Sequence, residues 1–287
     1  MTETLAADTA MGAVTLRVRD LDAQTSYYRD GVALNVLATE SGRVVLGRGT
    51  TPIVILEHAP ELRHAPRGEA GLFHTAIVFD SREALAAAVF SLATRYPGTF
   101  TGSSDHLVSN AFYFDDPEGN GVELYWDRER TEWSWVHGQL EMGTLFLDPN
   151  AFLREYLTEA SREDARVGAA QVGHVHLQVG DVTTAHEFYV DRLGFDLTMS
   201  YGRQAIFVSA GGYHHHMAMN TWNSAGAGPR TPGLGLSLIE IDGPTADDLG
   251  ALTGRMRHAG IETRDDGRTV EVSDPWGSRI RVCAAEE

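Results

Sequence analysis

The sequence has very little cysteine: Cys283 is the only one among 287 residues. A single thiol cannot form an internal disulfide, and it cannot build a zinc cluster of several thiolates. Any metal must therefore be held by histidine and carboxylate side chains. Long apolar runs are also missing, because no stretch approaches the ~18 residues that a bilayer-spanning helix needs.

Basic residues are scarce relative to acidic ones. Lys and Arg number 23 against 40 Asp and Glu, so the formal net charge at pH 7 is −17. Nucleic acids and anionic membranes would be repelled, and neither is expected as a partner. The segment Met1–Asp8 lacks the basic and apolar stretches of a signal peptide. We therefore expect a cytoplasmic protein, and a chain of this length predicts about two domains.

Two segments of the chain align without a gap. Gly12–Asp20 reads GAVTLRVRD, and Gly173–Asp181 reads GHVHLQVGD. The alternation of apolar residues predicts a strand in both, and each closing aspartate marks the start of an amphipathic helix. The first and third quarters of the chain are therefore expected to be copies of one module.

A second kind of repeat follows each copy. Gly71–Phe79 predicts a strand, and Ser81–Thr94 predicts an alanine-rich helix with a serine N-cap. Asn110–Tyr125 then predicts two strands around an Asp-Pro-x-Gly turn. The C-terminal counterparts of these three segments are Gly233–Ile241, Ala246–His258 and Asp274–Arg281.

These repeats predict an α+β fold of four β-α-β-β-β modules. We expect two tandem domains, 10–126 and 171–285, joined by a connector at 127–170 in which Asp148–Asn150 begins a helix. Further strands are expected at Arg43–Leu46, Ile53–Glu57, Phe195–Tyr201, Gln204–Val208 and His214–Asn220.

Strand alternation predicts which side chains meet. In the third module Val175 and Leu177 belong to an apolar face that should pack beneath the module's helix. His174 and His176 belong to the opposite face, which we expect to line a solvated cup. In the run His214–His216, alternation turns His216 into the cup and His215 away, unless a bulge shifts the register.

Several motifs resemble the vicinal oxygen chelate superfamily. They are the strand His174-Val-x-Leu-x-Val-x-Asp, the His-x-Ala strand at His74, and Asp116-Pro-x-Gly-Asn-Gly-Val-Glu123. The His214–His216 run and Tyr113, ten residues before Glu123, resemble the extradiol, catechol 2,3-dioxygenase type of that superfamily. The resemblance covers nearly the whole chain apart from the connector.

In that superfamily two modules pair into one cup, with metal ligands on the first and last strands of the pair. If modules pair in chain order, His74 and Glu123 share one cup and His174 stands alone in the other. If the second module pairs with the third and the first with the fourth, these three side chains converge. Two imidazoles and one carboxylate are the ligand set of non-haem Fe(II) oxygenases. We therefore predict the crossed pairing, with Ala13 and Arg281 in a metal-free second cup.

The resemblance also implies a role for each residue. Fe(II), with Mn(II) as an alternative, would be held by His74, His174 and Glu123. An aromatic diol of the catechol type would react there with O₂ to give a muconate semialdehyde. His216 would act as acid–base catalyst, and Tyr113 would donate a hydrogen bond to a substrate oxygen. The remaining candidates for substrate contact are His176, His106 and Asn220.

Other interpretations of these residues stay open. Each histidine alone could be an ordinary hydrogen-bonded one, Tyr113 could be core packing, and His214–His216 could be a surface feature. A glyoxalase-like isomerase or a thiol transferase of the same superfamily would use more carboxylate and fewer imidazole ligands. A metal-free module that binds an aromatic compound or drug is an alternative of another class. The predicted sheet edges permit a homodimer without requiring one.

Overall fold

The computed structural model describes residues 4–243 and 245–284. These residues form two compact units. One contains residues 16–62 and 74–173; the other contains the remaining described residues, 4–15, 63–73 and those from 174 on. Within the described ranges, no helix is long and apolar enough to cross a membrane.

The unit of residues 16–62 and 74–173 contains most of the first module. Helix α1 (Leu21–Ser26) begins after Asp20, as predicted, because the Asp20 carboxylate accepts a hydrogen bond from the Ala23 N–H. It continues directly into the π-helical turn η1 (Tyr27–Gly31). The strands that follow are β2 (Asn35–Glu40), β3 (Arg43–Arg48) and β4 (Thr51–His58).

The second module belongs to the same unit apart from the first residues of its first strand. Its helix α2 (Arg82–Arg95) starts after Ser81, whose hydroxyl accepts a hydrogen bond from the Ala84 N–H. The serine N-cap and the alanine-rich helix are therefore both confirmed. The strands are β5 (Gly71–Phe79), β6 (Phe100–Asp105), β7 (Ser109–Asp115) and β8 (Gly121–Asp127).

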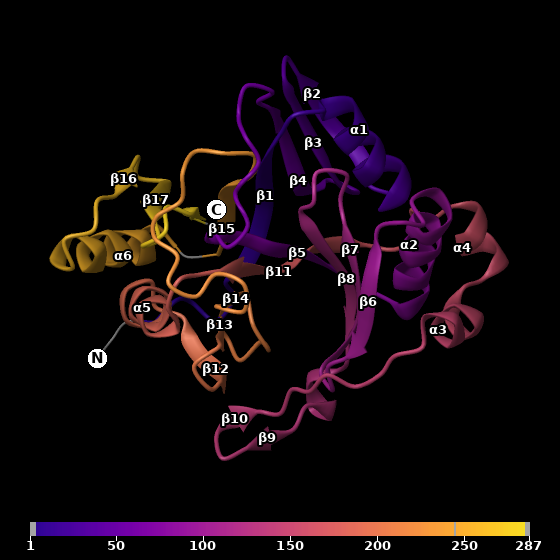
Figure 1. Cartoon of the computed structure of the whole chain (residues 1–287). Helices are drawn as coiled ribbons and strands as arrows, with labels where there is room; N and C mark the ends of the chain where they lie inside the picture. Colours follow the sequence, from indigo (N-terminus) through magenta and orange to yellow (C-terminus); the bar gives the residue numbers. More distant parts are fainter. Residues whose placement is uncertain (1–3, 244, 285–287) are drawn as a thin grey trace. The chain divides into compact units, whose positions relative to one another are not determined.

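The connector packs beside the second module. Helix α3 (Pro149–Tyr156) begins after Asp148, as predicted, and α4 (Glu159–Glu163) follows it. Both helices contact α2, and the three lie side by side in Figure 1. The rest of the connector's regular structure is η2 (Arg130–Glu132), β9 (Trp135–Val136) and β10 (Gln139–Leu140).

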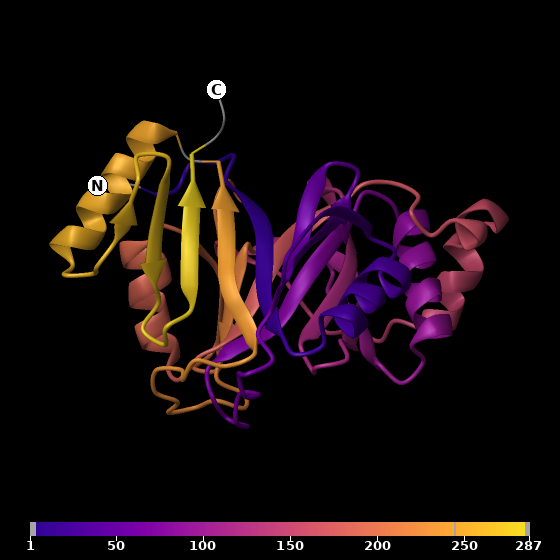
Figure 2. The same ribbon diagram turned by 90° about the horizontal axis from the view of Figure 1, so that it is seen from above.

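The other unit contains the third and fourth modules. Helix α5 (Val182–His186), with Asp181 as its N-cap, continues into the π-helical η3 (Glu187–Arg192). Helix α6 (Ala246–His258) packs against the outer strands of the fourth module (Figure 2). The strands are β11 (Ala170–Gln178), β12 (Asp196–Tyr201), β13 (Ala205–Ser209), β14 (Met217–Asn220), β15 (Gly235–Asp242), β16 (Arg264–Asp265), β17 (Thr269–Ser273) and β18 (Arg279–Cys283).

The strand order confirms the crossed pairing of modules. The first sheet runs β16-β17-β18-β15-β1-β4-β3-β2, where β1 is Ala10–Val18, so it joins the fourth module to the first. The second sheet runs β12-β13-β14-β11-β5-β8-β7-β6 and joins the third module to the second. The α+β fold of four modules in two curled sheets is thus as predicted. The tandem division into 10–126, 127–170 and 171–285 stays a prediction, and its last residue, Ala285, lies outside the described residues.

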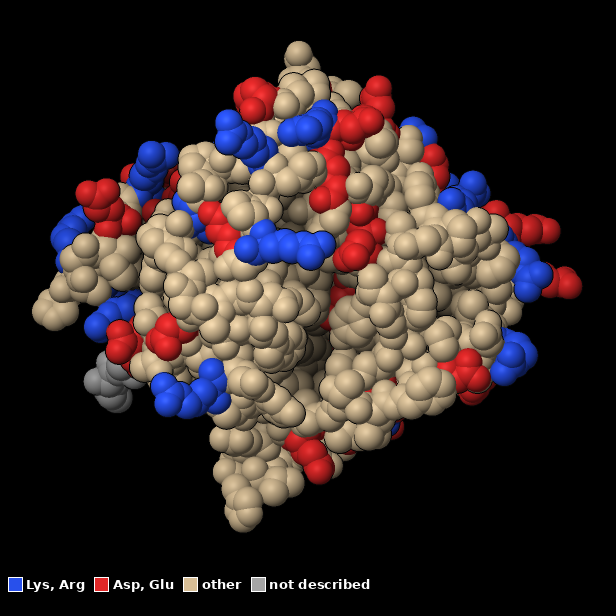
Figure 3. All heavy atoms as spheres, viewed as in Figure 1, with Lys and Arg blue, Asp and Glu red and all other residues tan. Residues whose placement is uncertain are grey.

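The apolar faces predicted from alternation are buried. Val175 and Leu177 of β11 and Val179 directly after it have no exposed surface, and the same is true of Val14, Leu16 and Val18 in β1. Burial of each such side chain contributes about 1.5–3 kcal/mol to folding. Charged side chains of both signs lie interspersed over the molecular face drawn in Figure 3.

Candidate metal centre

His74 and Glu123 meet inside the unit of residues 16–62 and 74–173. Strands β5 and β8 run parallel with Ala76 opposite Glu123, and the His74 Nε2 atom lies 2.9 Å from Glu123 Oε2. Both side chains are buried, with 6% and 3% of their surface exposed. Metal bonds of about 2.0–2.2 Å place neighbouring ligand atoms about 3 Å apart. This pair therefore fits two adjacent positions of a metal's coordination sphere.

The Asp-Pro-x-Gly turn holds the strand that carries Glu123. Asp116 is buried, and one oxygen of its carboxylate accepts hydrogen bonds from the N–H groups of Glu118 and Asn120. The other oxygen accepts from the Tyr28 hydroxyl and from Asn120 Nδ2. Burial raises the pKa of Asp116, and the hydrogen bonds from Asn120 and Glu118 offset part of this effect. The turn motif thus anchors the start of β8 to the first module.

Tyr113 lies next to this pair, on β7. Residue Tyr113 is opposite Glu123 in the β7–β8 register, and its ring centroid is 5.7 Å from that of His74. Burial, together with the nearby Glu123 carboxylate, raises the pKa of Tyr113 well above its usual range. The phenol therefore keeps its proton and can act as a hydrogen-bond donor.

His106 sets the orientation of the Tyr113 hydroxyl. The His106 Nδ1 atom is 2.7 Å from the carbonyl oxygen of Gly143, which can only accept, so Nδ1 carries a proton. The other nitrogen, Nε2, is 2.6 Å from the Tyr113 oxygen. In a neutral imidazole with this tautomer, Nε2 accepts the phenolic hydrogen bond. The structure thus brings together four sequence-predicted residues, His74, Glu123, Tyr113 and His106.

His174 stands in the other unit, in β11. The preceding residue, Gly173, has no room for a side chain, because a Cβ atom there would lie 1.7 Å from the Tyr125 hydroxyl oxygen. Glycine at this position lets the backbone immediately before His174 pass the tyrosine. The imidazole itself is buried, with 2% of its surface exposed.

Two further imidazoles, those of His214 and His215, lie beside His174. The ring centroid of His174 is 4.1 Å from that of His215 and 5.9 Å from that of His214. His214 Nδ1 and His215 Nδ1 are 2.7 Å apart, a hydrogen bond in which one ring donates and the other accepts. The imidazoles of His214 and His215 are both buried. This cluster is one of the groups of side chains that could hold a metal ion.

Strict alternation fails at His214–His216. The His216 ring is nearly parallel to Phe195, and its Nδ1 accepts a hydrogen bond from the Ala210 N–H. His215 instead lies beside His174 and contacts Phe207 edge-on. The prediction that His216 turns toward the cup and His215 away is therefore wrong. Regular strand β14 begins only at Met217, and the preceding turn has two residues with positive φ, Gly211 and Gly212.

His176 and Asn220 meet on neighbouring strands of the third module. Asn220 Oδ1 accepts a hydrogen bond from the Trp222 N–H, so its Nδ2 faces His176 Nε2, 3.0 Å away, and donates to it. The rings of Phe73 and Trp222 lie 5.0 and 5.4 Å from the His176 ring. Alternation predicted the positions of His176 and Asn220, but it gave no signal for these aromatic neighbours.

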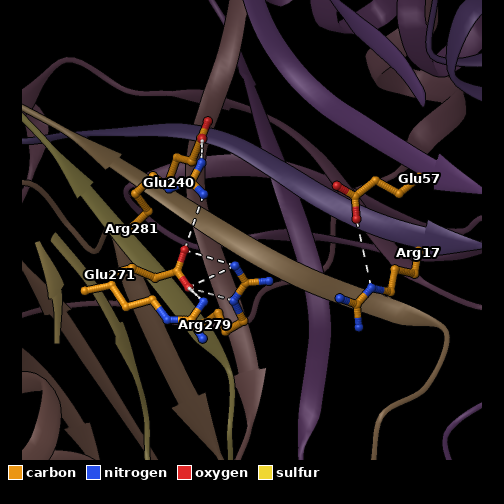
Figure 4. A network of polar contacts seen from close by, with 7 residues as sticks. Arg17, Glu57, Glu240, Glu271, Arg279 and Arg281 are labelled. Atoms are coloured by element: carbon orange, nitrogen blue, oxygen red, sulfur yellow. Dashed lines mark hydrogen bonds and ion pairs between the residues drawn. The ribbon is translucent and has the colours of Figure 1, made fainter. Parts of the chain in front are cut away.

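The first sheet carries ion pairs at the corresponding positions. Arg281 of β18 is placed as Glu123 is in β8, and it pairs with Glu240 and Glu271 at 3.1 and 3.3 Å (Figure 4). Separately, Arg17 and Glu57 form a longer ion pair of 3.9 Å. Ala13 offers no ligand atom. Among the residues that the structure describes, the groups able to hold a metal draw on residues of the second sheet and of the turn before β14.

The two curled sheets and their module repeat define the class of protein. A family model, the "Glyoxalase/Bleomycin resistance protein/Dioxygenase superfamily", matches residues 171–282. Sequence comparison extends the relationship over nearly the whole chain: a Bacillus subtilis (strain 168) protein named "Catechol-2,3-dioxygenase" is 35% identical over 273 residues, which is 93% of this chain and 94% of that protein. The chain belongs to this superfamily.

Solved structures share the fold. A putative dioxygenase from Bacillus subtilis subsp. subtilis str. 168 superposes with a TM-score of 0.64 at 13% identity, over 100% of this chain and 87% of that one. Glyoxalase I from Zea mays gives 0.59 at 15% identity, over 96% and 92% of the two chains. At these identities the likeness concerns the fold alone.

Proposed function

We propose that this protein is an extradiol ring-cleaving dioxygenase. It would insert both atoms of O₂ into a catechol-type aromatic diol, next to the hydroxyl groups, and give a muconate semialdehyde. The observation that carries this proposal is the buried His74–Glu123 pair in a chain 35% identical to a protein named catechol-2,3-dioxygenase.

The metal of this reaction would be held by His74, Glu123 and His174. His74 and Glu123 belong to one unit and His174 to the other, and β11, β5 and β8, which carry them, are successive neighbours in the second sheet. Two imidazoles with one carboxylate suit Fe(II), and they also suit Mn(II). When bound, such a metal lowers the pKa of a diol hydroxyl and leaves positions for the diol and O₂.

Tyr113 and His106 would bind and orient the diol. Because its pKa is raised by burial and by Glu123, Tyr113 stays protonated. Its single O–H, which His106 Nε2 accepts, would turn to a substrate oxygen when the diol binds. His106, held by the Gly143 carbonyl, positions that hydroxyl. His176 and Asn220 would contact the substrate beside the aromatic rings of Phe73 and Trp222, which favour an aromatic ligand.

A histidine would supply acid–base catalysis. The sequence pattern assigns this role to His216, but the contacts of its ring with Phe195 and Ala210 favour His215, which lies next to His174. We therefore propose that the His215 imidazole holds and returns a proton at the oxygen being inserted. An imidazole is suited to this role because its ordinary pKa lies near neutral pH.

The proposal is tested with purified protein loaded with Fe(II) under anaerobic conditions. On addition of catechol and air, we expect O₂ uptake together with a yellow ring-cleavage product, and neither in the Glu123→Gln variant. Binding of catechol without product, by protein that contains iron, would contradict the proposal. Aromatic-compound binding in protein that takes up no metal would support the metal-free binding module instead.

A further inference from the structure

We propose that His174, His214 and His215 form a second, nitrogen-only metal site that takes Zn(II) or Cu(II). The three imidazoles belong to one unit, so the site does not depend on the other half of the chain. One ligand atom from each ring lies within 4.8 Å of the other two. All three rings are buried, with 2%, 1% and 8% of their surface exposed.

The spacing of the His214 and His215 nitrogens is near that of two nitrogen ligands on one metal ion. Zinc–nitrogen bonds of about 2.0–2.1 Å in tetrahedral geometry separate the ligand nitrogens by about 3.3 Å. The 2.7 Å contact between His214 Nδ1 and His215 Nδ1 would therefore open by about 0.6 Å, and the metal would replace the hydrogen bond between them.

The neighbouring rings restrict how the cluster can move. Tyr213 lies 4.0 Å from the His214 ring centroid, and Phe207 contacts His215 edge-on at 5.1 Å. His216, although adjacent in sequence, is not a member of the cluster, and its Nδ1 accepts a hydrogen bond from the Ala210 N–H. His216 is therefore a matched control for substitutions in the cluster.

The ligand types determine which metals fit. Three neutral imidazoles supply no negative charge, whereas the His74, Glu123 and His174 set includes a carboxylate. Imidazole suits zinc and copper, and affinities of divalent metals for nitrogen ligands rise toward Cu(II) and exceed those of Fe(II). The nitrogen-only set would therefore prefer Zn(II) or Cu(II) over Fe(II).

His174 belongs to both ligand sets, and the effect of this on the enzyme rests on the proposed function. A neutral imidazole has one nitrogen lone pair for a metal, so zinc bound by His214, His215 and His174 would withdraw His174 from the iron set. Zinc or copper would then displace iron and inhibit the enzyme, rather than add a second metal to it. The ion that the chain carries would depend on the metals available.

The test uses the Glu123→Ala variant of the full chain, titrated with Zn(II) by calorimetry and with Co(II) by visible absorption. We expect about one zinc per chain and the intense absorption of tetrahedral Co(II). Adding His214→Ala should weaken zinc binding at least about tenfold, the loss typical even of an outer-shell partner. Adding His216→Ala instead should leave the zinc affinity unchanged, and far-UV circular dichroism checks that each variant is folded.

Two results would overturn the proposal: no zinc binding by Glu123→Ala, or equal loss of binding from His214→Ala and His216→Ala. The titration uses zinc and cobalt without catechol, so it does not depend on ring cleavage. If iron-loaded wild-type protein fails to cleave catechol while Glu123→Ala still binds zinc through His214, only the proposed function fails.

Discussion

The Nε2 atom of His74 and the Oε2 atom of Glu123 lie 2.9 Å apart on two adjacent parallel strands, in a buried setting. A buried carboxylate is costly unless it is paired or coordinates a cation. The strand register sets this contact, because Ala76 of β5 opposes Glu123 of β8, and His74 lies two residues before Ala76 on β5.

Glu123→Gln should lose Fe(II) binding and ring-cleavage activity together. The amide keeps the size of the side chain but removes the charge that balances the metal, so the loss of iron affinity should exceed the roughly 10–100-fold effect of an outer-shell partner. The iron content of each protein after anaerobic loading and desalting measures the loss of iron affinity. Glu240→Gln, in the ion pairs of the first sheet, is the matched control and should retain iron. Full iron occupancy in Glu123→Gln would contradict the assignment.

His215→Ala and His216→Ala should differ in their kinetics. Loss of the acid–base group should lower kcat by roughly 10²-fold or more in His215→Ala. His216→Ala should retain most of kcat but melt at a lower temperature, because its ring packs on Phe195 and bonds the Ala210 N–H. Steady-state kinetics, with iron content measured in parallel, checks the kcat of both variants, and thermal unfolding checks the melting temperature. A large fall in kcat confined to His216→Ala would return the catalytic role to that residue.

Gly173→Ala should destabilise the protein because the new Cβ would overlap the Tyr125 hydroxyl. Overpacking of this kind costs about 1–3 kcal/mol of unfolding free energy. Denaturant unfolding measures the loss, and adding Tyr125→Phe, which removes the overlapping oxygen, should restore part of it. If Tyr125→Phe fails to improve Gly173→Ala, the close approach is not the cause.

Asp116 should make stability fall as pH rises above about 4, the ordinary aspartate pKa. Burial raises its pKa in the folded protein, so between the unfolded and folded pKa values the folded state binds more protons than the unfolded state. Unfolding free energy therefore declines across that window. Denaturant unfolding at several pH values should show a shallower decline in Asp116→Asn. An unchanged slope would show that Asp116 does not titrate as described.

Much of the fold could be predicted because each module repeats the same pattern. The apolar alternation of β11 and the Ser81 N-cap of α2 are local signals, and the structure follows both. The exposed strand β2 and the polar strand β6 were not located, because they have no continuous apolar face. The module pairing was reached through ligand chemistry rather than through local pattern, and the strand order agrees with it.

The candidate site shows where alternation stops being informative. His74 and Glu123 lie inside regular parallel strands, so period-two reasoning places their side chains correctly. The run His214–His216 precedes β14 and follows two glycines with positive φ, so the backbone there is not extended and the alternation shifts. The Gly211-Gly212 pair is the sequence signal that could have indicated this shift.

The most direct test of the central claim is an iron anomalous-difference map from crystals of the Fe(II)-loaded protein, grown and frozen without oxygen. We predict a single strong peak within bonding distance of His74, Glu123 and His174. A peak bonded to His214 and His215 instead, or no peak at the Glu123 carboxylate, would contradict the account.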